Sequence, residues 1–166
     1  MVWNALILVF VGVAAIIDAR HQRIPNALNT AGLCAGLTYH WISGTFLSAL
    51  LAAFIGFIVG LALFELAAIG GGDVKLLAAL GALLGFQTWM HAFQIMVLVA
   101  GLMSLIQVVR HRAVKRTLTN MWAIIRNLFT NGWRAHSRIN LSMPEAIRIP
   151  FGVAAALGTA FVLVVR

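Results

Sequence analysis

Residues 46–73 read FLSALLAAFIGFIVGLALFELAAIGGGD, a long apolar run that ends in three glycines and an aspartate. The run over residues 46–69 is long enough to cross a bilayer, which takes roughly 20 residues in a helix. Three consecutive glycines weaken a helix, since each forgoes about 0.5–1 kcal/mol of helix preference relative to alanine. The stretch therefore predicts a membrane-spanning helix, a break in it, and an aspartate, Asp73, at the membrane boundary.

The composition of the whole chain is that of a membrane protein. The 166 residues are 62% hydrophobic and only 10% charged, with a mean hydropathy of +0.98, whereas a soluble domain has about 25% charged residues. The apolar stretches are continuous and lack the two-residue alternation of a β-barrel. They favour helices, which satisfy their own backbone hydrogen bonds in lipid. We predict an all-α polytopic membrane protein that forms a single domain over residues 1–166.

Six segments are predicted to span the membrane: 3–17, 27–42, 46–69, 74–85, 91–109 and 149–165. The fourth is short for a bilayer, so it is expected to be tilted, shielded by its neighbours, or extended through Gln87. The first segment lacks the basic start and the small-residue exit of a cleavable signal peptide, because it ends in Asp18-Ala19-Arg20. We therefore expect it to be retained as a helix.

The basic residues predict the orientation of these spans. Eleven of the twelve Lys and Arg residues lie in the connections after the first, third and fifth spans, and those after the second and fourth hold none. By the positive-inside rule the basic side is cytoplasmic, so both termini are expected outside and Asp18 and Asp73 at the cytoplasmic boundary. Four aromatic residues fall near the opposite boundary, as an interfacial belt would: Trp3, Tyr39, Trp41 and Trp89.

Most of the +8 net charge lies in the segment 110–148, between the last two spans. Its apolar residues recur at helical spacing opposite Lys115, Arg116 and Arg126, which predicts an amphipathic helix lying on anionic lipid at the cytoplasmic interface. A docking surface for a substrate or partner is the alternative. Nucleic-acid binding is not expected, because the charge is explained by the membrane topology.

No metal or cofactor site is predicted. The lone Cys34 lies inside the second span, so the chain has no disulfide framework and no thiolate metal site. The five histidines lack the spacing of a known ligand set such as HExxH.

Asp18 and Asp73 are the only aspartates in the chain. A carboxylate near the hydrocarbon core costs about 2.5–3.5 kcal/mol on insertion scales, so such residues usually have a function. Two carboxylates brought together can share one proton, which leaves one as a base and the other as an acid, as in an aspartyl protease. Two alternatives remain: a small transporter in which Asp18, Glu65 and Asp73 form a proton or cation path, and a non-enzymatic assembly subunit of a secretion machine.

Three stretches in this order resemble the type IV prepilin peptidases, which are intramembrane GxGD aspartyl proteases. They are Asp18 with Ile24-Pro25-Asn26, then Gly70-Gly71-Gly72-Asp73-Val74-Lys75-Leu76, then Ile149-Pro150-Phe151-Gly152. The resemblance implies that Asp18 and Asp73 are the catalytic pair. It also implies a prepilin or pseudopilin substrate, whose short basic leader is removed at the cytoplasmic face of a bacterial or archaeal cytoplasmic membrane. Residues expected to bind substrate or shape the site are Gly70, Gly72, Lys75, Pro25, Asn26 and Glu65.

The chain departs from the larger members of that family in its cysteine content. Those members carry an N-terminal domain with two CxxC pairs that is linked to N-methylation of the mature pilin, whereas this chain has one cysteine. Methyltransferase activity is therefore doubtful. The compact form looks like the peptidases of the tight-adherence (Flp) pilus branch or the archaeal preflagellin-type enzymes.

Overall fold

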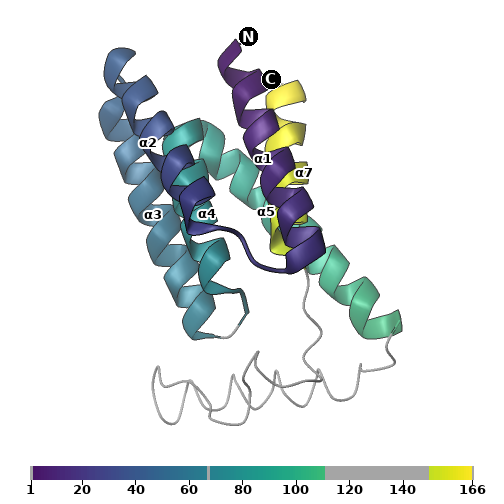
Figure 1. Ribbon diagram of the computed structural model, residues 1–166. Helices are drawn as coiled ribbons and strands as arrows, with labels where there is room; N and C mark the ends of the chain where they lie inside the picture. The colour runs from purple at the N-terminus through teal and green to yellow at the C-terminus, as the bar shows by residue number, and fades with distance from the viewer. Residues whose placement is uncertain (1, 67, 111–149, 166) are drawn as a thin grey trace.

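A computed structural model describes residues 2–66, 68–110 and 150–165, and over these ranges the chain is helical, with no strand. The helices are α1 (Val2–His21), α2 (Asn26–Ile42), α3 (Phe46–Glu65), α4 (Gly71–Leu84), α5 (Phe86–Arg110) and α7 (Phe151–Val165) (Figure 1). The prediction of an all-α polytopic membrane protein is confirmed. The amphipathic helix expected within 110–148 lies almost wholly outside the described residues.

Three helices are long and apolar enough to cross a membrane: α1, α3 and α5 through Gln107. Among the others described, α7 is apolar but has 15 residues, while α2 and α4 have 17 and 14. The predicted range of the third span, 46–69, is too long at its C-terminal end. The helix stops at Glu65 instead of residue 69, because the backbone leaves helical geometry after Leu66 to lead into α4.

The helices form two groups, which Figure 1 shows side by side. In one group α4 packs against α2 and α3, and in the other α7 packs against α1 and α5; α4 and α7 have only a small contact. From Val74 to Gly85 only the side chain of Lys75 is exposed. The short fourth span is therefore shielded by its neighbours, one of the three arrangements expected for it.

Glycines allow the backbones of the first group to come close together. A Cβ added to Gly36 would lie 2.5 Å from the carbonyl carbon of Ala82, and one added to Gly56 would lie 2.6 Å from the carbonyl oxygen of Leu77. Small residues four apart allow this close approach between helices in lipid. Gly85 has a different function, because its φ of +71° makes the turn between α4 and α5.

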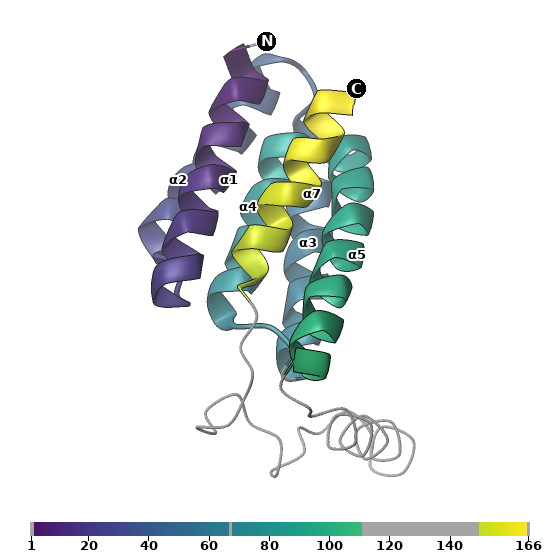
Figure 2. The same ribbon diagram turned by 90° about the vertical axis from the view of Figure 1, so that its right-hand side faces the viewer.

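The two ends of the bundle differ in side-chain chemistry. Both termini lie at one end, and the end of α1 and the starts of α4 and α7 lie at the other (Figures 1 and 2). At the end with the termini, the ring of Trp3 stacks on Tyr39 at 3.8 Å, and Trp3 Nε1 donates a hydrogen bond to the carbonyl oxygen of Leu83. The opposite end carries the basic residues of the described chain, which are Arg20, Arg23, Lys75 and Arg110. This segregation agrees with the predicted topology.

Candidate active site

Asp18 lies in the last turn of α1, where its side chain is buried against the start of α7. Its Oδ2 accepts a hydrogen bond of 2.7 Å from the backbone N–H of Gly152, the second residue of α7. The first N–H groups of a helix have no partner within the helix, and the helix dipole favours a negative charge there. Asp18 therefore caps a helix that begins more than a hundred residues later in the chain.

Gly152 is needed for this contact. A Cβ added to Gly152 would lie 2.9 Å from the Cβ of Asp18 and 3.0 Å from its Oδ2. Real Cβ atoms essentially never approach other atoms as closely as 2.9 Å. Any other residue at position 152 would push α1 away from α7, or turn the carboxylate away from its hydrogen bond.

Asp73 is the third residue of α4 and is held at the start of its own helix. Its Oδ2 accepts a hydrogen bond of 2.9 Å from the backbone N–H of Gly70, which is the N-cap residue. This is half of a capping box, in which the side chain at the third position satisfies an N–H that the helix cannot. Gly70 is extended, with φ −85° and ψ 160°, so the break before α4 falls at Gly70 itself.

The structure thus brings the two aspartates to the same end of the bundle from the two different helix groups. Asp18 lies against the first turn of α7, and Asp73 lies in the first turn of α4. Each is anchored through one oxygen to a backbone N–H. Within residues 2–66, 68–110 and 150–165, the second oxygen of each forms no hydrogen bond. Each free oxygen can exchange a proton with a molecule that reaches it.

Of the three glycines before Asp73, Gly72 lies against the connection between α1 and α2. A Cβ on Gly72 would lie 3.4 Å from the backbone nitrogen of Ile24 and 3.5 Å from its carbonyl oxygen. Among the described residues, a Cβ on Gly70 would meet only Asp73 Oδ2, at 3.4 Å, and one on Gly71 only Phe64, at 3.8 Å. These are ordinary van der Waals distances, so packing against the described residues does not require glycine at these three positions.

Lys75 and Asn26 are brought together, since Lys75 Nζ donates a hydrogen bond of 2.7 Å to Asn26 Oδ1. Asn26 is the first residue of α2, and Pro25 precedes it with an extended backbone. This contact joins the starts of α2 and α4.

Glu65 is the exposed last residue of α3, and its side chain forms no hydrogen bond within the part of the chain that the structure describes.

Two residues at this site were not assigned a role from the sequence. The Nδ2 of Asn29 donates a hydrogen bond of 3.0 Å to the carbonyl oxygen of Gly72, and the Asn29 side chain is 3% exposed. Gly152 belongs to the motif Ile149-Pro150-Phe151-Gly152, but no function was predicted for this glycine. The available signals were a polar residue three positions after Asn26 on the same helical face, and a glycine two positions after a proline that precedes an apolar span.

The described residues contain no group of three or more His, Cys, Asp or Glu side chains that could hold a metal ion. The segment 111–149 lies outside this search. The expectation of a metal-free site stays a prediction.

Comparisons with known proteins converge on one family. Residues 5–105, which include both aspartates, match the Type IV leader peptidase family. The chain is 38% identical over 125 residues to a prepilin leader peptidase/N-methyltransferase of Pectobacterium carotovorum subsp. carotovorum, an alignment that covers 69% of this chain and 43% of that protein. The chain thus spans less than half the length of this relative. No solved structure significantly matches the present chain. The family predicted from the motifs is confirmed: the chain belongs to the type IV leader peptidase family.

Proposed function

We propose that the chain is an intramembrane aspartyl endopeptidase, with Asp18 and Asp73 as its catalytic pair. The observation that carries the proposal is that Asp18 and Asp73 lie at the same end of the bundle, each anchored through one carboxyl oxygen to a backbone N–H. Family membership supports the reaction class.

The proposed chemistry needs one aspartate charged and the other protonated. The charged carboxylate takes a proton from a water molecule as the water oxygen attacks the carbonyl carbon of the peptide bond. The protonated carboxyl donates its proton to the carbonyl oxygen, which stabilises the tetrahedral intermediate. That intermediate collapses when the C–N bond breaks. The aspartate that took the proton from water donates it to the leaving amine, and a hydroxyl proton of the intermediate returns to the other aspartate, which restores the pair. The proposal assigns the two roles to the pair and not to one named aspartate.

The proposed substrates are prepilins and pseudopilins, cut between a short leader and a hydrophobic helix. Two features support a cut at the membrane boundary. Both aspartates lie at one end of the bundle, and that end carries the basic residues typical of the cytoplasmic side of a membrane protein. A substrate helix in the bilayer would present its leader junction at this depth. In this proposal both termini face outward, and the basic segment between α5 and α7 contacts anionic lipid.

The test is co-expression with a prepilin-like substrate, followed by electrophoresis of the membrane fraction. A shortened product is expected with the wild-type chain and not with an empty vector. A transporter or an assembly subunit would leave the substrate at full length. That outcome would contradict the proposal.

A further inference from the structure

One exposed face of α5 carries a heptad pattern. Exposed residues recur along it at alternating spacings of four and three, at Gln87, His91, Gln94, Leu98, Gly101 and Leu105. We call these six residues the α5 seam. The alternation of four and three is the spacing by which two helices pack in a left-handed coiled coil. Since all six are exposed, no helix of the described chain occupies this face.

The outer half of the α5 seam is polar although α5 is a candidate membrane span. Gln94 lies eight residues after the start of the helix, about 12 Å along its axis at 1.5 Å per residue. The side chains of Gln87 and Gln94 form no hydrogen bond within the described ranges. Polar side chains that face lipid without a partner are unfavourable, and in membrane proteins they hydrogen-bond across helix interfaces.

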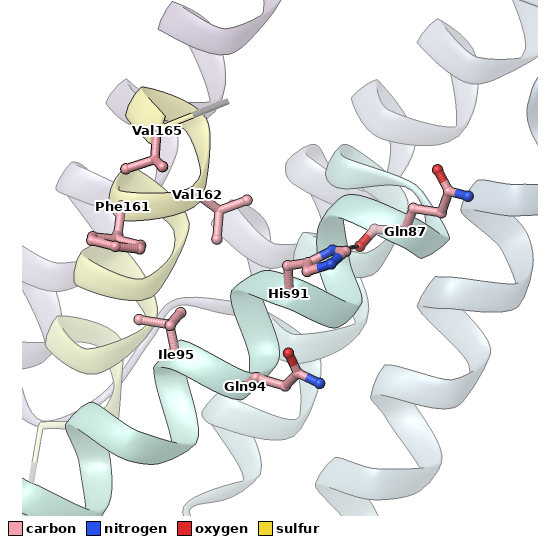
Figure 3. Close-up of a pocket in the computed structure, with 7 residues that line it drawn as sticks. All are labelled: Gln87, His91, Gln94, Ile95, Phe161, Val162 and Val165. Atoms are coloured by element: carbon pink, nitrogen blue, oxygen red, sulfur yellow. Dashed lines mark hydrogen bonds between the residues drawn. The ribbon is translucent and has the colours of Figure 1, made fainter.

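One ring nitrogen of His91, Nε2, has no hydrogen-bond partner among the described residues. His91 Nδ1 lies 2.8 Å from the carbonyl oxygen of Gln87 (Figure 3). A carbonyl oxygen can only accept, so Nδ1 carries the proton, and Nε2 of the neutral ring is an acceptor. The amides of Gln87 and Gln94 each offer both donors and an acceptor. The polar half therefore contains both the donors and the acceptors needed to form hydrogen bonds with the polar half of a second copy.

The inner half of the α5 seam is apolar and contains Gly101, which packs against no other helix of the described residues. Leu98 and Leu105 are 68% and 61% exposed. A Cβ added to Gly101 would have no atom of the described chain within 4 Å, in contrast to Gly36 or Gly56. Glycine weakens a helix interior, and its usual benefit in a membrane helix is close approach of a neighbour. No helix of the described residues is such a neighbour.

A pocket of about 380 Å³ lies beside the polar half of the α5 seam. Besides the three polar residues of the seam, the pocket is lined by Ile95 of α5 and by Phe161, Val162 and Val165 of α7. Figure 3 shows the α7 residues beside the row formed by Gln87, His91 and Gln94. This pocket leaves room for side chains of a helix that packs along α5.

We propose that the α5 seam is a dimer interface, at which α5 of one copy packs against α5 of a second copy of this chain. Both copies insert in the same orientation, so the helices run parallel about a two-fold axis along the membrane normal. Each seam residue then meets its own counterpart. Amides pair with amides, and Gln87 or Gln94 of one copy can donate to His91 Nε2 of the other. The α5 seam contains neither Asp18 nor Asp73, so the inference does not depend on the proposed peptidase activity.

A cysteine scan along α5 tests this interface. In a Cys34→Ala background, single cysteines replace the seam residues Gln94, Leu98 and Leu105, or the exposed neighbours Val97 and Ile106, which lie to either side of the seam. Oxidation of the membranes should yield a disulfide-linked product of twice the chain mass, several-fold more for the seam positions. Equal yields at all five positions, or no dimer at any, would show that the seam faces lipid and would overturn the proposal.

A matched pair of glycine variants gives a second test. Gly101→Ile places a bulky side chain on the α5 seam, and Gly12→Ile places the same side chain on α1. At both positions an added Cβ meets no atom of the described residues within 4 Å. Energy transfer between labelled copies in the membrane should show association weakened about tenfold by Gly101→Ile and unchanged by Gly12→Ile. Unchanged association for Gly101→Ile, at equal abundance, would contradict the interface.

Discussion

The backbone N–H of Gly152 donates a hydrogen bond to Asp18 Oδ2 and thereby joins the last described helix to the first. The two residues are 134 positions apart in the chain. The contact fixes one candidate catalytic carboxylate against the start of α7.

Gly152→Ala should therefore disable the site. The new Cβ would stand 2.9 Å from the Cβ of Asp18, a distance that requires a shift of the carboxylate or of α7. We expect at least about a tenfold loss of cleavage rate, since a small misplacement of a catalytic group is costly. The measurement is processed substrate at equal enzyme abundance. Gly12→Ala is the control, because its Cβ meets no atom within 4 Å in the part of the chain that the structure describes. Equal activity of the two variants would refute the role of Gly152.

The glycines before Asp73 test how a substrate reaches the site. Alanine at Gly70 or Gly72 meets the enzyme's own atoms only at van der Waals distances, and alanine favours a helix, so both variants should fold. If an extended substrate segment lies beside Asp73, Gly72→Ala should lose most activity and Gly70→Ala much of it. Gly71→Ala should be tolerated better. Full activity of the first two variants would show that the triple glycine is only a helix break.

Asn29 is expected to act as a positioning residue for Asp73. Its amide holds the carbonyl oxygen of Gly72, the residue just before Asp73. Asn29→Ala removes this buried hydrogen bond, which is worth about 1 kcal/mol and more when a partner is left unsatisfied. We expect kcat to fall about tenfold with little change in KM. The exposed neighbour Thr30 provides the control, through Thr30→Ala. A change in KM alone would argue for a substrate contact instead.

A metal-independent reaction is the fourth expectation. Chelation of purified enzyme with EDTA should leave the cleavage rate unchanged, because two carboxylates and a water complete the proposed chemistry. Loss of activity that zinc restores would contradict the mechanism.

The sequence predicted the elements better than their contacts. Long apolar runs and the segregation of Arg20, Arg23 and Lys75 are local signals, and the helices and the basic end of the bundle followed from them. The end of α3 at Glu65 did not follow, because Leu66 to Ile69 are as apolar as the helix before them.

The contacts that hold the aspartates depend on which helices become neighbours. The pairing of Asp18 with Gly152 requires α1 to lie against α7, and the hydrogen bond from Asn29 requires α2 to lie against α4. Nothing in the spacing of the spans along the chain determines those neighbours. The motif glycine Gly152 and the polar Asn29 could be noticed in the sequence, but their functions could be assigned only once these helices were seen together.

The most direct measurement compares Asp18→Asn, Asp73→Asn and Glu65→Gln for cleavage of a co-expressed prepilin-like substrate at equal membrane abundance. Asparagine keeps the size of the side chain and can still accept the hydrogen bond from Gly152 or Gly70, but it cannot exchange the proton. Glu65 is the exposed acid at the same end that makes no hydrogen bond in the described chain. We expect no shortened product from either aspartate variant and measurable product from Glu65→Gln. Substantial cleavage by Asp73→Asn or Asp18→Asn would contradict the aspartyl mechanism.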